Sequence, residues 1–142
     1  MAAGNRETVS GSAAEPNFER AARLRRVLRD FNRQSEQIVR RHGLTLEQYQ
    51  LLLLIRVRPK EQATIGNLFK ELNRGQSAVT QLARRMENRG LISRELSRRD
   101  ARVRYLKLTS RGAQRLSEAV TALEEERSRL LELIRALNGS GD

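Results

Sequence analysis

The chain has 142 residues, a formal net charge of +11, one histidine and no cysteine. A chain of this length can bury about two thirds of its unfolded surface, so we expect one globular domain that needs no disulfides. The missing cysteines and the single histidine exclude thiolate and histidine metal sites, and we expect no cofactor. The longest apolar run, 51–55, is too short to span a bilayer, and the start of the chain lacks a hydrophobic signal. We therefore expect a soluble, cytoplasmic protein that does not bind membranes.

Basic residues outnumber acidic residues by 28 to 17, and only Lys60, Lys70 and Lys107 are lysines. A domain this basic is expected to bind a polyanion. The planar guanidinium of arginine can contact a phosphate or a guanine edge through two parallel hydrogen bonds. An arginine excess also follows from biased genome composition, so the charge alone does not select duplex DNA as the partner.

Residues 1–16 offer almost nothing apolar to bury, so we expect a disordered tail before a single domain at 17–142. Asn17 is a suitable N-cap for a long helix over 18–42, and Gly43 supplies a left-handed stop. Residues on one side of this helix follow one another at spacings of three and four, and we expect this side to be buried. Its members are Leu24, Leu28, Phe31, Ser35, Ile38 and His42. The arginines on the other faces are expected to form a solvated surface rather than a second nucleic-acid site.

The next segment reads as a helix-turn-helix. Thr45 and Gln48 form a capping-box pattern that opens a helix with an apolar centre, and Pro59 prevents its continuation. Thr64 begins a short helix, and the turn at 73–75 leads to a further helix over 76–89. Two short helices joined by a tight glycine turn are typical of a DNA-binding unit.

The helix over 76–89 has one apolar stripe, formed by Val79, Leu82 and Met86, which we expect to face the core. Its other side begins with short, uncharged polar residues and continues with arginines, a pattern suited to the major groove of DNA. The candidate DNA-binding residues of this helix are Gln76, Ser77, Ala78, Thr80, Gln81, Arg84 and Arg85.

Gly90 closes that helix, and two strands are predicted at 91–95 and 103–108. The polar loop between them, 96–102, is predicted to be a wing beside the helix pair. The candidate DNA-binding residues of the wing are Arg98, Arg99, Asp100 and Arg102.

A last helix is predicted over 110–137, about 42 Å long at 1.5 Å per residue. Its apolar seam alternates by four and three and is interrupted only by Arg127. So long a seam requires a partner helix, from a second copy of the chain and from the first helix. Arg127 could anchor a ligand or partner, but pairing with an acidic residue such as Glu124 is the simpler expectation. We therefore predict dimerisation helices at 17–43 and 110–137 around a winged-helix lobe at 45–109.

Several motifs in this order resemble the MarR family of winged-helix transcription regulators. The most specific are Asp100-Ala101-Arg102 in the wing and, at its exit, Leu108-Thr109 followed by Gly112, which are similar to the D-x-R and L-T-x-x-G signature of that family. Leu44-Thr45 and the segments 76–82 and 90–92 also match. The resemblance covers roughly residues 18–123.

The resemblance implies a homodimer that binds a pseudo-palindromic operator and represses transcription until a small aromatic effector releases it. It also implies that the helix over 76–89 enters the major groove, that Arg102 enters the minor groove and that Asp100 holds this arginine. His42 and Tyr49 would then border the effector pocket. Many members have arginine in place of Gln81, and the family usually has a further C-terminal helix, whereas 30 residues follow Gly112 here.

These patterns predict a mainly α fold with a small β-wing: a winged helix-turn-helix domain with long N- and C-terminal dimerisation helices. An enzyme is not expected, because no phosphate loop, activated nucleophile or carboxylate pair in an apolar setting is present. Two alternatives are an architectural or nonspecific DNA-coating protein and a protein-interaction module. The neutral polar face at 76–81 favours base reading over simple attraction to phosphate.

Overall fold

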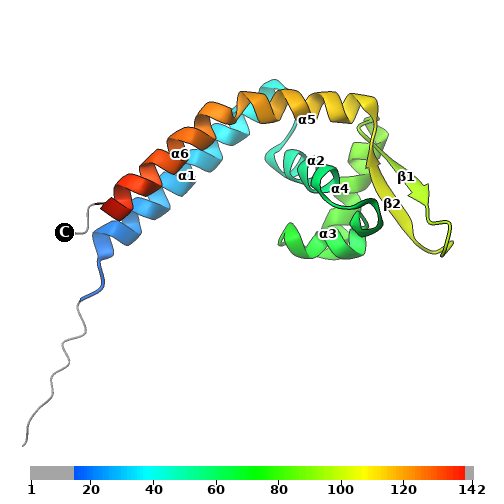
Figure 1. Cartoon of the computed structure of the whole chain (residues 1–142), viewed down its shortest axis with the longest axis horizontal. Helices are drawn as coiled ribbons and strands as arrows, with labels where there is room; N and C mark the ends of the chain where they lie inside the picture. Colours follow the sequence, from blue (N-terminus) through cyan, green and yellow to red (C-terminus); the bar gives the residue numbers. More distant parts are fainter. Residues whose placement is uncertain (1–14, 140–142) are drawn as a thin grey trace, which may run out of the picture.

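The computed structural model describes residues 15–139, so most of the expected tail at 1–16 lies outside the described residues. Figure 1 shows an arm, in which α1 and α6 lie side by side, and a compact lobe that holds α2, α3, α4 and the two strands. α5 connects the strands with the arm. The elements are α1 (Phe18–Arg41), α2 (Leu46–Val57), the 3-10 turn η1 (Lys60–Gln62), α3 (Ile65–Glu71), α4 (Gln76–Asn88), β1 (Ile92–Leu96), β2 (Arg104–Leu108), α5 (Ser110–Ala122) and α6 (Glu124–Gly139).

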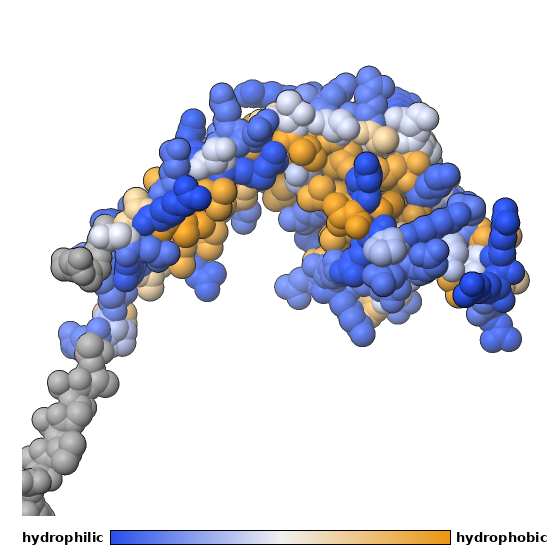
Figure 2. All heavy atoms as spheres, in the orientation of Figure 1, coloured by the Kyte–Doolittle hydropathy of each residue, from blue (hydrophilic) through white to orange (hydrophobic). Residues whose placement is uncertain are grey.

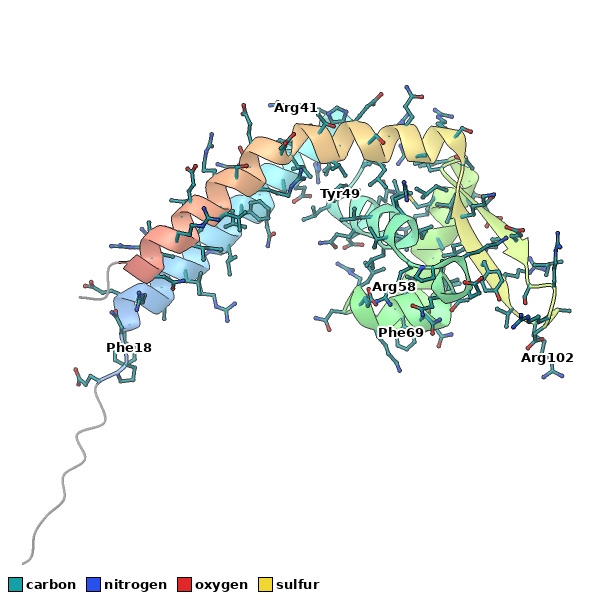
Figure 3. The ribbon with its side chains drawn as sticks, viewed as in Figure 1. Phe18, Arg41, Tyr49, Arg58, Phe69 and Arg102 are labelled. Atoms are coloured by element: carbon teal, nitrogen blue, oxygen red, sulfur yellow. The ribbon has the colours of Figure 1, made fainter. Side chains whose placement is uncertain are left out.

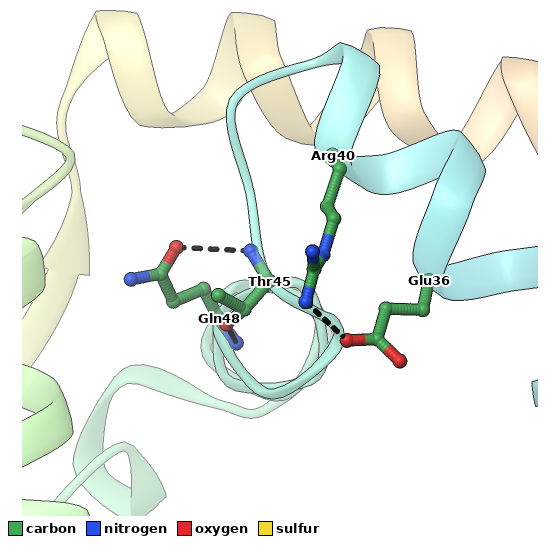
Figure 4. A network of polar contacts seen from close by, with 4 residues as sticks. All are labelled: Glu36, Arg40, Thr45 and Gln48. Atoms are coloured by element: carbon green, nitrogen blue, oxygen red, sulfur yellow. Dashed lines mark hydrogen bonds and ion pairs between the residues drawn. The ribbon is translucent and has the colours of Figure 1, made fainter. Parts of the chain in front are cut away.

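The predicted helix starts are confirmed by the capping contacts. The side chain of Asn17 accepts a hydrogen bond from the Arg20 amide at 3.0 Å, and α1 ends before Gly43, whose φ is +72°. Thr45 and Gln48 exchange the two hydrogen bonds of a capping box, both 3.1 Å long (Figure 4). Because these caps satisfy amides that the helix itself cannot pair, α1 and α2 begin where the sequence predicts.

The core of the lobe forms around α2, as its apolar sequence predicts. Leu51 and Leu52 of this helix are fully buried, and Figure 2 shows apolar side chains gathered between α5 and the rest of the lobe. The largest fully buried side chains are Val39, Leu44, Leu51, Leu52, Leu68, Val79, Met86, Leu91 and Ile92. Among residues 15–139, no helix is both long and apolar enough to cross a membrane.

The predicted wing is confirmed as an antiparallel pair of strands. Ile92 lies opposite Leu108 and Leu96 lies opposite Arg104. Each strand begins one residue later than predicted. Val103 is outside β2 because its amide is used in the loop, where it donates to the Asp100 carbonyl at 3.0 Å.

The single helix predicted over 110–137 is wrong, because the chain forms two helices that meet at Leu123. At this break the Arg127 guanidinium donates to the Val120 carbonyl at 2.9 Å. A side chain that binds a helix carbonyl is a recognised cause of a kink. Arg127 therefore has a carbonyl partner in the structure rather than the expected carboxylate of Glu124.

The seam of the last helix is covered, over the length of α6, by α1 of the same chain. The two helices run antiparallel in the arm (Figure 1), and the Arg20 guanidinium at the start of α1 donates to the Leu137 carbonyl, with Nε at 2.8 Å. Leu137 is largely buried. Of the two partners predicted for this seam, the first helix of the same chain is confirmed, and the second copy of the chain stays a prediction.

The junction between β2 and α5 explains the spacing of threonine and glycine in the predicted signature. Thr109 caps α5 by accepting from the Gly112 amide at 3.0 Å, and its hydroxyl donates to the Gly90 carbonyl at 2.6 Å. The Thr109 amide donates to the Leu91 carbonyl at 3.1 Å. A Cβ atom at position 112 would collide with that same carbonyl oxygen. Glycine is required at 112 because α5 starts directly against the backbone of Leu91.

We predict that Gly112→Ala lowers the free energy of unfolding by about 1 to 3 kcal/mol, because the added methyl group displaces backbone rather than a flexible side chain. Urea denaturation of the purified chain measures this change. Gly66→Ala is the matched control, since Gly66 also lies in a helix but the nearest atom to its Cβ position is 4.0 Å away. There, alanine should be neutral or stabilising. Equal effects of the two substitutions would contradict the role assigned to the Leu91 carbonyl.

Candidate nucleic-acid interface

The helix-turn-helix is formed by α3, a short turn and α4. Thr64 caps α3 by accepting from the Asn67 amide at 3.2 Å. In the turn, Asn73 adopts a φ of +53°, a left-handed conformation that asparagine tolerates better than most residues. Two ion pairs attach this unit to α2: Arg74 of the turn pairs with Glu47, and Arg58 pairs with Glu71 of α3. The turn and α3 are therefore attached to α2 and to Arg58, the residue that caps it.

α4 divides into a buried side and an exposed side, as predicted. Val79 and Met86 are fully buried and Leu82 is 6% exposed. The hydroxyl of Thr80 donates to the Gln76 carbonyl one turn earlier at 2.8 Å, so this side chain is half-buried and turned towards the helix. The other candidate residues are exposed, namely Gln76, Ser77, Ala78, Gln81, Arg84 and Arg85. We call this exposed side, with Thr80, the α4 face.

The α4 face contains a hollow that is lined by uncharged polar residues and one arginine. The lining residues are Gln76, Ser77, Thr80, Gln81 and Arg84. Amide and hydroxyl groups both donate and accept hydrogen bonds, so such a surface can pair with base edges as well as with phosphate.

The wing loop is ordered by its own polar contacts. The Ser97 hydroxyl accepts from the amides of Arg99 and Asp100 at 3.2 and 3.3 Å, and Tyr105 donates to the same oxygen at 3.3 Å. The Asp100 carboxylate accepts from the Arg102 amide at 3.0 Å. Asp100 thus holds Arg102 through its backbone, whereas the guanidinium extends from the tip of the wing (Figure 3).

Both strands of the wing are attached to the lobe at residues 60–63. The Lys60 ammonium of η1 lies 2.9 Å from a Glu95 carboxylate oxygen of β1, and Leu106 of β2 donates its amide to the Ala63 carbonyl at 2.7 Å. The hydrogen bond and charge of Lys60 hold the pKa of the Glu95 carboxyl below its ordinary value. Glu95 therefore stays ionised, and the contact persists, well below neutral pH.

A second hollow lies between the start of α3 and the wing, and sequence reasoning did not find it. It is lined by Thr64, Ile65, Gly66, Arg94, Arg102, Val103, Arg104 and Leu106. Arg94 of β1 and Arg104 of β2 line this hollow together with Arg102. No spacing in the sequence relates residues 64–66 to residues 94–106, so only the tertiary fold could show this cluster.

Comparison with known proteins gives the same fold. A family model for the MarR family matches residues 42–103, which span α2, the helix-turn-helix and most of the wing. AbsC, a MarR family transcriptional regulator from Streptomyces coelicolor, superimposes with a TM-score of 0.66 at 24% identity, covering 84% of this chain and 88% of AbsC. Over residues 42–103 the chain is therefore similar to the MarR family, and its fold is that of the solved structures.

Two further structures similar to this chain are of proteins bound to DNA. MepR of S. aureus in a DNA complex gives a TM-score of 0.69 at 21% identity over 79% of this chain and 82% of MepR. The transcriptional regulator MosR of M. tuberculosis, also in complex with DNA, gives 0.62 at 23% identity over 78% of each chain. A search of curated protein sequences found no match. These likenesses show that the chain has the fold of these winged-helix proteins.

The predicted effector residues, His42 and Tyr49, occupy two different environments. Tyr49 is 8% exposed and packs in the core of the lobe. His42 ends α1, with Nδ1 3.8 Å from a Glu118 carboxylate oxygen of α5. Both residues have contacts within the chain itself, and the effector pocket at His42 and Tyr49 stays a prediction.

Proposed function

We propose that this chain binds a pseudo-palindromic DNA operator as a homodimer and acts there as a transcriptional repressor. The observation that carries the proposal is the pairing, on one lobe, of the uncharged α4 face with an arginine-rich wing. Residues 76–83 contain no charged side chain, whereas residues 97–104 contain four arginines and one aspartate. Base contacts supply sequence discrimination and phosphate contacts supply affinity, so the two surfaces have complementary roles.

The resemblance of the signature motifs supports the same reading. In it, α4 enters the major groove, and the wing reaches the adjacent minor groove with Arg102. The two copies of α4 in a dimer must lie on one face of the duplex, so half-sites should be about 10 base pairs apart between centres. Nonspecific coating of DNA is the competing function, and it requires the positive charge but no base contacts.

We predict that Gln81→Ala changes the sequence preference of the protein, because an amide can pair with an adenine edge at a discrimination of about 1 to 3 kcal/mol. Selection from a random duplex library, with the full chain before and after substitution, measures the preferred operator. Gln37→Ala is the control, since Gln37 is an exposed amide on α1. Recovery of no preferred sequence by the unsubstituted chain would favour nonspecific coating and would remove the proposed function.

Arg102→Ala is expected to weaken binding most strongly on operators whose flanks are A/T-rich, because narrow minor grooves concentrate negative potential. Affinity measured at several salt concentrations on duplexes with A/T-rich and G/C-rich flanks separates this effect from a simple loss of charge. Arg26→Ala, on the exposed surface of α1, removes the same charge far from the wing. If Arg102→Ala and Arg26→Ala weaken the two duplexes equally, Arg102 does not enter the minor groove.

Self-association is proposed to use the arm, where apolar side chains remain exposed after α1 and α6 have packed together. Figure 2 shows apolar side chains on the arm among hydrophilic ones, and a groove between the two helices has both kinds in its lining. It is lined by Val27, Asp30, Phe31, Gln34, Glu126, Arg129, Leu130 and Leu133. Leu24 and Leu131 are exposed elsewhere on the arm, by 39% and 54%. A second copy of the chain can cover these side chains with its own arm across a two-fold axis.

We predict that Leu133→Arg raises the dimer dissociation constant at least about tenfold, because a charge buried without a partner in an apolar interface is costly. Sedimentation over a range of protein concentrations measures the change. Leu96→Arg is the control, since Leu96 is 57% exposed but lies in the wing. A Leu133→Arg chain that remains as dimeric as the Leu96→Arg chain would place the interface elsewhere.

A further inference from the structure

Arg89, which lies between α4 and Gly90, makes contacts outside its own helix. Arg89 caps the C-terminus of α4. Its guanidinium donates through Nη1 to the side-chain oxygen of Gln48 at 2.9 Å and through Nη2 to the Gly43 carbonyl at 2.5 Å. One planar group thus joins the end of the helix that carries the α4 face to the corner between α1 and α2.

This corner, which we define as residues 42–48, is where the arm meets the lobe. The Gln48 side-chain oxygen that accepts the hydrogen bond from Arg89 also accepts one from the Thr45 amide, in the capping box of α2. The Arg115 guanidinium of α5 donates to the His42 carbonyl at 3.4 Å. Arg89 and Arg115 therefore both bind carbonyls just after the last turn of α1, where the helix dipole favours positive charge.

The contacts of Arg89 differ in kind from the other attachments of α4. The ion pair between Glu87 and Arg94, at 2.9 Å, connects α4 with β1 and stays inside the lobe. Apolar packing of Leu82, Ala83 and Met86 holds α4 to the core but is non-directional. Two charge-assisted hydrogen bonds from a rigid fork fix an orientation as well as a distance.

We propose that Arg89 is a positioning residue that sets the angle between α4 and the arm, and thereby the spacing of half-sites that the dimer accepts. The proposal rests on the proposed function, because it concerns two copies of α4 held by joined arms. Each copy of α4 is placed on DNA by its own arm, so a loosened corner lets the two copies adopt several separations. Arg89 itself need not touch the operator. Substitution of Arg89 should therefore change the range of half-site spacings that the dimer accepts more than it changes the affinity for a single half-site.

The experiment uses the full chain and duplexes recovered by selection with that unsubstituted chain. The central spacer is lengthened or shortened in steps of one base pair, and a duplex with a single half-site is included. We expect the unsubstituted chain to lose about tenfold or more in affinity when the spacer changes by two base pairs, and Arg89→Gln to lose less than about threefold. The two proteins should bind the single half-site with equal affinity.

Arg94→Gln is the matched control, since it removes one arginine contact of α4 that does not reach the arm, and it should keep the spacing preference. Arg89→Lys keeps the charge at the end of α4, but one ammonium cannot present the planar fork to both acceptors. It should therefore lose the spacing preference as Arg89→Gln does. Rescue by lysine would show that only the charge is needed, and this result would overturn the proposal.

The failure of this inference can be told from the failure of the proposed function. A spacing preference that is present in the unsubstituted chain and retained by Arg89→Gln overturns the role of Arg89 alone. Equal loss of preference in Arg89→Gln and Arg94→Gln also overturns it. A chain that selects no sequence at all overturns the proposed function, and the spacing role with it.

Discussion

The carbonyl group of Leu91 is the point on which the arrangement of wing, lobe and arm depends. It accepts the Thr109 amide at the end of the strand pair, and Gly112 of α5 packs directly against it. The hydrogen bond that follows the strand pair and the first turn of α5, which leads to the arm, therefore both contact one backbone oxygen. Since Thr109 also caps α5, strand pairing and helix initiation cannot be separated here. The wing is thereby placed at a fixed position relative to α5.

The arginines of this protein divide into those that hold the fold and those that are available for a partner. Arg58, Arg74 and Arg94 pair with carboxylates that lie on other elements. On the α4 face and the wing, by contrast, no carboxylate of the described residues lies within ion-pair distance of Arg84, Arg85, Arg98, Arg99 or Arg102. The net charge alone could not make this division, because it depends on which acids the fold brings near. These five arginines lie on the two surfaces proposed to contact DNA, and exposed arginines of α1, such as Arg26, are likewise outside the ion pairs of the described residues.

The helix starts were predictable because capping is local chemistry. Asn17, Thr45, Thr64 and Thr109 each accept a backbone amide three residues later, and this pattern is visible in the sequence. The two sides of α4 were predictable for a similar reason, since periodicity alone separates Val79 and Met86 from Gln76 and Gln81. The wing followed from a turn between two short alternating segments.

The break at Leu123 was missed although the sequence contains a signal for it. The seam continues with the same spacing through the break, so periodicity predicted one helix. However, Glu124, Glu125 and Glu126 form the first turn of α6, where the helix dipole favours acidic residues. This run is therefore a local signal for a new helix start. The partners of Arg89 and Arg127 could not be predicted, because both are carbonyl or amide oxygens that leave no charge pattern.

Polar contacts at two places, the corner at 42–48 and the junction of α5 with α6, therefore determine where the arm points. At the first, Arg89 and Arg115 bind the corner at 42–48 and fix the angle between α1 and the lobe. At the second, Arg127 binds the Val120 carbonyl where α5 bends into α6. Because α1 and α6 pack along their length, the bend at Leu123 must follow the direction that the corner gives to α1. A change at either place would therefore redirect the packed helix pair, and the separation of two lobes in the proposed dimer would change with it.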